Sequence, residues 1–150
     1  MAQSLSNILL HIVFSTRNRR PEIGAEIEPQ LFANLTATGQ TLGCPIHAVG
    51  GAADHIHIAC SLSRANSASK LVQELKQASS KWLKTQGSQF ADFDWQNGFA
   101  AFSISQSELD DLRGFIGGQR EYHRGISFQD EYRELLTRHG IEFVERHVWD

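Results

Sequence analysis

The feature that most constrains the fold is an almost unbroken apolar run at residues 7–15. It contains Ile8, Leu9, Leu10, Ile12, Val13 and Phe14. A strand with one face in water alternates apolar and polar side chains, whereas a strand covered on both faces is apolar nearly throughout. The run therefore predicts a central strand of a sheet.

The segments that follow predict the rest of an α+β domain. Apolar residues recur at helical spacing over 25–42, just before Gly43, and again over 66–86, where Asn66 or Ser67 suits an N-cap. Strands are expected at 46–49, 55–62 and 98–104, and a glycine-containing hairpin loop at 50–54. The order is that of a ferredoxin-like βαββαβ antiparallel sheet with two helices on one face. Helices at 107–122 and 127–139 and an irregular or short extended tail at 141–150 complete the chain.

Composition limits the class of protein. A chain of 150 residues is the size of one domain, so we expect a single domain over 1–150. The hydrophobic fraction of 41% and charged fraction of 21% are those of a soluble protein, and no apolar run is long enough to cross a membrane. The start has no export signal, so we expect a cytoplasmic protein in which Cys44 and Cys60 are small buried residues.

Two histidines one residue apart, His55 and His57, are the first chemical signal. In a strand they share one face, while Ile56 and Ile58 point the other way into a core. Two imidazoles so placed can bind one divalent metal, although the same pattern also occurs as a hydrogen-bonded histidine or a structural zinc ligand. The nearby glycine loop leads us to expect an accessible site.

The helix expected at 107–122 carries Leu112, Phe115, Gln119 and Tyr122 along one stripe, at steps of three, four and three residues. The stripe has two interpretations. It either packs into the core with Gln119 held by a hydrogen bond, or it offers Gln119 as a third metal ligand. The spacing alone does not choose between them.

Several segments together resemble one known family. They are HIVFSTR at 11–17, DHIHI at 54–58, SSKW at 79–82, GFAAFS at 98–103, SFQDEY at 127–132 and ERHVWD at 145–150. In this order they are similar to the IS-two-hundred-like single-strand transposases of the HUH class, which have one catalytic tyrosine. The resemblance covers nearly the whole chain.

The resemblance implies an enzyme that cleaves and rejoins hairpin-marked single-stranded DNA through a 5'-phosphotyrosine. It implies a divalent metal, magnesium or manganese, with His55, His57 and Gln119 as ligands. It also implies a homodimer. Residue 115 matches the position of the nucleophilic tyrosine, but it is phenylalanine in this chain, which has no hydroxyl to attack a phosphate.

Tyr122 is the tyrosine on the same stripe and the alternative candidate for the nucleophile. It lies seven residues beyond Phe115, about 10 Å of helical rise, and beyond Gln119. We therefore expect that its hydroxyl does not simply take the place of the missing one. Glycines 114, 117 and 118 lie in the same segment, and each interior glycine weakens a helix by roughly 1 kcal/mol relative to alanine.

Charge indicates where DNA could bind. The net charge is −3, with the acidic excess in residues 105–150 and local basic clusters elsewhere. Candidate phosphate contacts are Arg17, Arg19, Arg20, Lys76 and Lys81. Three hypotheses follow: a transposase-family protein impaired at Phe115, a domesticated or engineered hairpin-binding protein that is catalytically inactive, and an unrelated metal hydrolase that uses the histidine pair.

Overall fold

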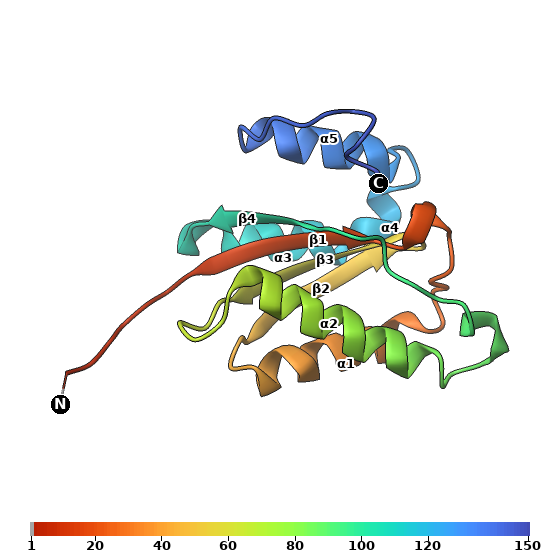
Figure 1. Ribbon diagram of the computed structural model, residues 1–150. Helices are drawn as coiled ribbons and strands as arrows, with labels where there is room; N and C mark the ends of the chain where they lie inside the picture. Colours follow the sequence, from red (N-terminus) through yellow and green to blue (C-terminus); the bar gives the residue numbers. More distant parts are fainter. Residues whose placement is uncertain (1) are drawn as a thin grey trace.

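The computed structural model describes residues 2–150 and contains one four-stranded antiparallel sheet (Figure 1). The strands are β1 (Leu9–Ser15), β2 (Ile46–Ala52), β3 (His55–Ser61) and β4 (Ala100–Ile104), in the spatial order β2-β3-β1-β4. The helices are α1 (Glu28–Thr41), α2 (Ala68–Leu83), α3 (Leu109–Gly117), α4 (Gln119–Tyr122) and α5 (Phe128–Arg138). Short 3-10 turns occupy Arg17–Arg19, Ser88–Phe90 and Gln106–Glu108. The strand order confirms the predicted ferredoxin-like arrangement.

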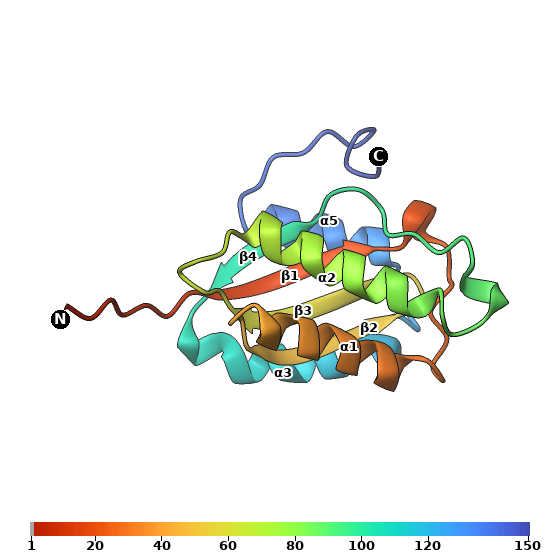
Figure 2. The same ribbon diagram turned by 60° about the horizontal axis from the view of Figure 1, so that its bottom comes forward.

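One face of the sheet packs on α1 and α2 and forms the main core. Alternate residues of the two central strands, among them Ile12, Phe14, Ile56 and Ile58, point into this core and are at most 2% exposed. Figure 2 shows both helices in front of the sheet. The apolar alternation on this side of β3 is therefore the one expected from the sequence.

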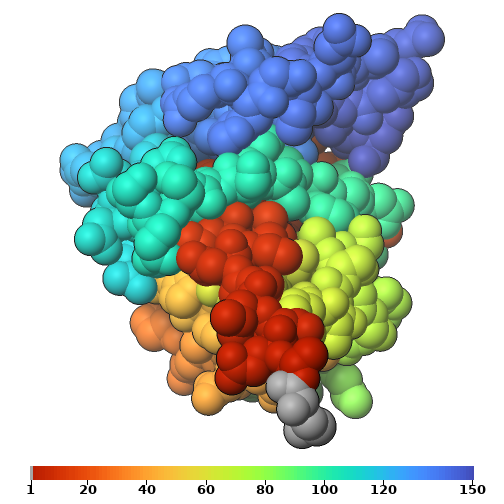
Figure 3. Space-filling view, turned by 90° about the vertical axis from the view of Figure 1, so that its left-hand side faces the viewer, coloured from red at the N-terminus to blue at the C-terminus, as the bar shows by residue number. Residues whose placement is uncertain are grey.

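The opposite face is covered as well. Near β2 and β3, Ala59 packs with Leu109 and Ile116 of α3, while Val13 and Phe102 pack with residues of α5 on the β1 and β4 side. The C-terminal residues form the upper layer in Figures 1 and 3. This double cover explains why all seven residues of β1 are buried, which is the pattern that predicted a central strand.

The helix ends follow local rules. The Ser67 hydroxyl accepts a hydrogen bond from the Lys70 amide at 3.0 Å and caps α2, and Gly43 follows α1 with φ +71°, a left-handed conformation that favours glycine. Both helices are shorter than expected, because residues 25–27, 42, 84 and 85 form turns and Ser67 is an N-cap residue with extended backbone. The single helix expected at 107–122 is instead divided at Gly118, which separates α3 from α4.

The expectation of a hairpin loop over residues 50–54 was wrong. Gly50 and Gly51 belong to β2, where they pair with His57 and Ile56 of β3, and only Ala53 and Asp54 form the turn. A Cβ atom at Gly50 would lie 2.0 Å from the carbonyl oxygen of Ile116. Glycine is thus required here for the close approach of α3 to the sheet, and not for a loop.

The tail, residues 141–150, has turns and no regular element, as expected. Its Trp149 ring lies against Tyr132 and beneath the guanidinium groups of Arg19 and Arg133. No helix within residues 2–150 has the length and apolar character needed to cross a membrane.

Candidate metal centre and nucleic-acid-binding residues

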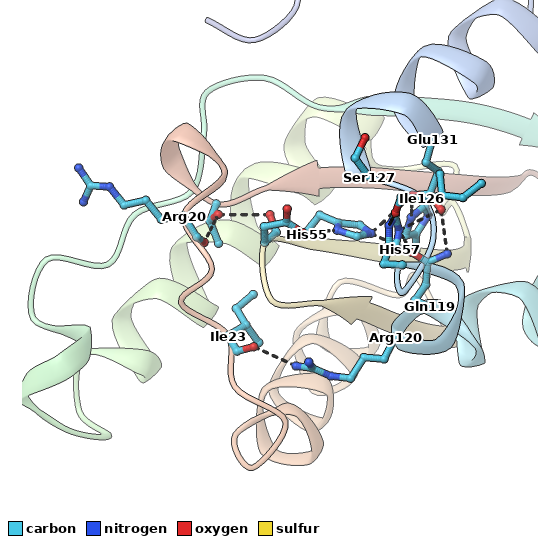
Figure 4. A network of polar contacts seen from close by, with 12 residues as sticks. Arg20, Ile23, His55, His57, Gln119, Arg120, Ile126, Ser127 and Glu131 are labelled. Carbon is cyan, nitrogen blue, oxygen red and sulfur yellow. Dashed lines mark hydrogen bonds and ion pairs between the residues drawn. The ribbon is translucent and has the colours of Figure 1, made fainter.

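The two histidines of β3 lie side by side, as the strand pattern predicts. The rings of His55 and His57 are 5.0 Å apart at 79°, and each side chain is 0% exposed. The Phe128 ring of α5 stacks on His55 at 4.3 Å and contributes to this burial. The accessible site expected from the sequence is therefore a buried one, because α4 and α5 cover this face of the sheet (Figure 4).

Each imidazole is oriented by a partner on its Nδ1 atom. The Nδ1 atom of His55 lies 2.7 Å from a carboxylate oxygen of Asp54, and that of His57 lies 2.7 Å from Nε2 of His11 on β1. Hydrogen bonds of this kind hold a histidine ring in one orientation. The two Nε2 atoms consequently face the space between the sheet, α4 and α5.

Two further polar side chains face those nitrogens. The amide oxygen of Gln119 lies 2.8 Å from Nε2 of His55, and a carboxylate oxygen of Glu131 lies 2.7 Å from Nε2 of His57. The amide nitrogen of Gln119 donates to the second carboxylate oxygen of Glu131 at 3.0 Å. Gln119 is thus brought to the histidine pair.

Glu131 was not foreseen as a site residue. Possible ligand atoms of His55, His57 and Glu131 all lie within 4.8 Å of one another. Glu131 is only 2% exposed and lies on the same buried side of α5 as Phe128 and Leu135. A carboxylate at helical spacing within an apolar stripe is a signal that could have identified it, since buried carboxylates need partners.

The protonation states suit a cation. Burial lowers the pKa of His57, and burial together with the neighbouring His57 lowers the pKa of His11 to about 3, so both rings are neutral at pH 7. Burial by itself raises the pKa of Glu131, but the hydrogen bond from His57, the nearby histidines and Gln119 outweigh it and lower that pKa. Two imidazole nitrogens, one carboxylate and one amide oxygen form a donor set that fits a divalent metal such as manganese or magnesium.

His123 is another residue that the sequence patterns did not bring out. Its Nε2 atom lies 3.0 Å from the Gln119 amide oxygen and 3.3 Å from a carboxylate oxygen of Glu131, and its ring is 4.5 Å from that of His55. The side chain lies at the edge of the buried cluster. It therefore joins the cluster to the turn that follows α4.

Phe115 and Tyr122 lie together beside the cluster. The Phe115 ring is 5.7 Å from the His57 ring, and the Tyr122 ring is 5.3 Å from Phe115 and 5.1 Å from His123. The separation expected from helical rise is therefore not what the rings show. Phe115 and Tyr122 belong to two helices that are separated at Gly118, so the rise of one continuous helix does not set the distance between their rings.

A charged group of the same cluster affects the pKa of Tyr122. Its pKa is raised, first by burial and then by the charges of Glu131 and Glu134, with a smaller opposing effect of Arg138. The phenol is thus within the electrostatic influence of the carboxylate of the candidate metal centre. Its side chain is partly exposed, whereas His55 and His57 are completely buried.

The five candidate DNA contacts separate into two groups. Arg17 forms a 2.7 Å ion pair with Asp94, the guanidinium of Arg19 lies over the Trp149 ring, and Arg20 is exposed. These three follow β1 and belong to one turn of the chain. Lys76 and Lys81 lie on α2, away from that turn in the sequence.

Lys76 and Lys81 line a groove of about 620 Å³ between α2 and residues 94–99. Lys81 is exposed. The ammonium group of Lys76 donates to the carbonyl oxygens of Gln96 at 2.8 Å and Gly98 at 2.5 Å. Lys76 therefore already fixes the wall of the groove, and Lys81 is the freer of the two cations.

The family model described as "Transposase IS200 like" matches residues 4–119. The chain belongs to this family. The match includes His55, His57, Phe115 and Gln119, and it ends before Glu131. No curated protein matches the chain.

Two solved structures share the fold of this IS200-like transposase family member. A putative transposase from Deinococcus radiodurans R1 is 15% identical, with a TM-score of 0.61 over 77% of this chain and 95% of the other. A REP-associated tyrosine transposase bound to a REP hairpin is 16% identical, with a TM-score of 0.54 over 77% of this chain and 70% of the other. At these identities the likeness concerns the fold.

Proposed function

We propose that this chain is a DNA-binding member of the transposase family that holds hairpin-marked single-stranded DNA at a divalent metal centre. The observation that carries the proposal is the convergence of four metal-ligating side chains, His55, His57, Gln119 and Glu131, from a strand and two helices. Family membership supports DNA as the partner. The REP hairpin bound to a protein of the same fold supports a hairpin as the recognised form.

The proposed ligands are those implied by the family, His55, His57 and Gln119, together with Glu131. Asp54 and His11 orient the two imidazoles from behind through their Nδ1 atoms. A bound magnesium or manganese ion would polarise the scissile phosphate and neutralise charge that develops on it. Gln119 and Glu131 hold each other in place by a hydrogen bond, so loss of either one disturbs both.

Phe115 cannot supply the nucleophile, because its ring carries no hydroxyl. The ring nevertheless packs beside His57, where the family's tyrosine position is expected. A second candidate function follows from this observation: a catalytically inactive hairpin-binding protein, domesticated or engineered. Phe115→Tyr separates the two, since restored covalent strand cleavage supports an intact catalytic apparatus and its continued absence supports a binding protein.

For the DNA itself, we propose that Lys81, Arg17 and Arg20 contact phosphates, with Arg19 and Lys76 shaping the adjoining surface. Arg17 must exchange its ion pair with Asp94 for a phosphate. Phosphate contacts of this kind position a strand without reading its bases and weaken as salt rises. Charge reversal at Lys81 should lower hairpin affinity and flatten its dependence on salt.

The test of the proposed function measures DNA and metal on the same samples. A labelled hairpin-bearing single strand should bind, by fluorescence anisotropy, more tightly than an unstructured strand or a duplex. Mn²⁺ binding, followed by electron paramagnetic resonance, should be lost in His55→Ala and His57→Ala. The matched control is His147→Ala, an exposed histidine of the tail. Absence of hairpin binding, or equal Mn²⁺ binding in all variants, would refute the proposal.

The family resemblance also leads us to propose a homodimer. Analytical ultracentrifugation of the full chain, with and without hairpin DNA, tests this directly. The mass of two chains in the complex supports the dimer, and the mass of one chain contradicts it.

A further inference from the structure

We propose that Tyr122 is the nucleophile of this chain and takes over the role that Phe115 cannot perform. The inference rests on the proposed function, because it needs DNA held at the His55 and His57 centre. It is not required by the proposed function, since a protein could bind hairpin and metal without cleaving.

The first observation is that the aromatic rings of Tyr122 and Phe115 contact each other. The two rings are 5.3 Å apart in an edge-to-face arrangement, and the Phe115 ring in turn meets His57 at 5.7 Å. Tyr122 also meets His123, whose Nε2 atom is 3.0 Å from Gln119. The phenol is therefore separated from the candidate metal centre by a single ring in two directions, Phe115 toward His57 and His123 toward Gln119.

The second observation is a contrast in exposure. His55, His57, Gln119 and Glu131 are 0–2% exposed, whereas Tyr122 is partly exposed at the end of α4. A nucleophile must contact both the site and an incoming strand. Tyr122 suits both requirements, because its ring contacts Phe115 and His123 and its side chain is partly exposed.

The third observation concerns the chain's only other tyrosine. The sequence contains two tyrosines, Tyr122 and Tyr132. The Tyr132 ring packs on Phe128 at 5.4 Å and on Trp149 at 5.6 Å, within the cluster between α5 and β4. Tyr132 is separated from His55 by the Phe128 ring, which itself stacks on that histidine. Tyr122 therefore reaches the site through two rings, Phe115 and His123, whereas Tyr132 reaches it through Phe128 alone.

The break between α3 and α4 places Tyr122 in a short helix separate from the one that carries Phe115. Gly118 ends α3 and begins α4, and the Tyr122 amide donates to the Gly118 carbonyl at 3.0 Å. A Cβ at Gly117 would meet no atom within 4 Å. This junction is thus open around Gly117, and α4 presents Gln119 inward and Tyr122 at the rim.

The chemical step is a transesterification. The phenolic oxygen of Tyr122 attacks the phosphorus of a phosphodiester, forming a tyrosine–phosphorus bond as the bond from phosphorus to the 3'-oxygen breaks. The phenol proton passes to solvent, and the departing 3'-oxygen takes up a proton to become a hydroxyl. The products are a 5'-phosphotyrosine and a free 3' end, and no oxidant or energy source is consumed.

The experiment uses the full chain, Mn²⁺ and a pool of labelled hairpin-bearing single strands with randomised flanks. Covalent adducts are resolved on a denaturing gel, and the modified peptide is located by mass spectrometry. The variants are Tyr122→Phe, Tyr132→Phe as the matched control, and Phe115→Tyr with Tyr122→Phe. Each keeps an aromatic ring, and thermal melting of every variant checks that it folds.

The expected result is an adduct in the unmodified chain that maps to Tyr122, disappears in Tyr122→Phe and persists in Tyr132→Phe. Hairpin and Mn²⁺ binding without an adduct, or an adduct that survives Tyr122→Phe, overturns this inference and leaves the proposed function standing. Absence of hairpin binding overturns both. An adduct only in the variant carrying tyrosine at 115 assigns the nucleophile to position 115 and overturns the inference.

Discussion

Gly50→Ala provides a direct test of how the structure holds the helix that carries Phe115. Gly50 lies in β2, directly beneath the last turn of α3. A Cβ there would lie 2.0 Å from the carbonyl oxygen of Ile116 and 2.8 Å from its carbonyl carbon and Cγ2. Because the nearest atom is helix backbone, no side-chain rotation can remove the overlap. Either α3 or β2 must move by roughly 1 Å.

The expected cost follows from this overlap. Overpacking a tight contact destabilises a protein by about 1–3 kcal/mol. Alanine in a strand is otherwise about 0.5–1 kcal/mol better than glycine, which offsets part of the loss. Complete detachment of α3 would expose Ile116 and Leu109, at about 1.5–3 kcal/mol each, and sets an upper limit. The difference between the two effects is about 0–2.5 kcal/mol, so we expect a net loss of about 1 kcal/mol.

The assay is thermal and urea unfolding of Gly50→Ala beside Gly117→Ala. A loss of 1 kcal/mol lowers Tm by about 2–4 °C in a chain of this size. Gly117 lies in α3 with no atom within 4 Å of its Cβ position, so alanine there should be neutral or stabilise by up to about 1 kcal/mol. Equal stability of the two variants would show that α3 does not pack closely on β2, and the reasoning would be wrong.

Three further predictions concern single polar groups. Glu131→Gln should weaken Mn²⁺ binding, measured by calorimetry, by at least about ten-fold, because it removes the only carboxylate among the proposed ligands. The control Asp130→Asn, which changes an exposed carboxylate, should leave the affinity unchanged. Equal affinities of the two variants would exclude Glu131 as a ligand. The folded-state pKa of Lys76 is lowered from 10.5 to about 8, mainly by burial and against the charge of Asp94. Between these pH values the unfolded chain keeps a proton that the folded chain has lost, so the urea concentration at the midpoint of unfolding should rise with pH across that window. The rise should vanish in Lys76→Met. A rise of the same size in that variant would contradict the assignment to Lys76. Ser79→Ala leaves the buried indole N–H of Trp95 without its 3.0 Å partner and should cost about 1–3 kcal/mol, measured as a lower Tm; an unchanged Tm would show that this N–H has found another acceptor.

The features that were predicted from the sequence are those that depend on residues close together in the chain. Strand alternation placed His55 and His57 on one face, helical spacing and a serine cap located α2, and the apolar run located β1. These features depend on residues that are close in the chain, so their patterns are visible without a structure. The resemblance to a known family then connected Gln119 to the histidine pair.

The features that were missed depend on contacts between distant segments. Glu131 is 74 residues from His57, and no spacing rule connects a helix carboxylate with a strand so far away. Gly50 was assigned to a loop because glycine is common in turns, whereas its role is to admit α3. Tyr122 was judged by the rise of one continuous helix, whereas the segment is divided into two helices at Gly118.

The cover that α5 provides over the sheet has a consequence for synthesis of the chain. β1, β3 and β4 are complete once residue 104 has been made, but Phe128 and Glu131, which enclose the histidines, are added later. Because a chain is made from its N-terminus, the face that bears His55 and His57 remains open until α5 emerges from the ribosome. A polypeptide interrupted between residues 119 and 128 would contain the matched family segment and expose its two imidazoles to any metal in solution.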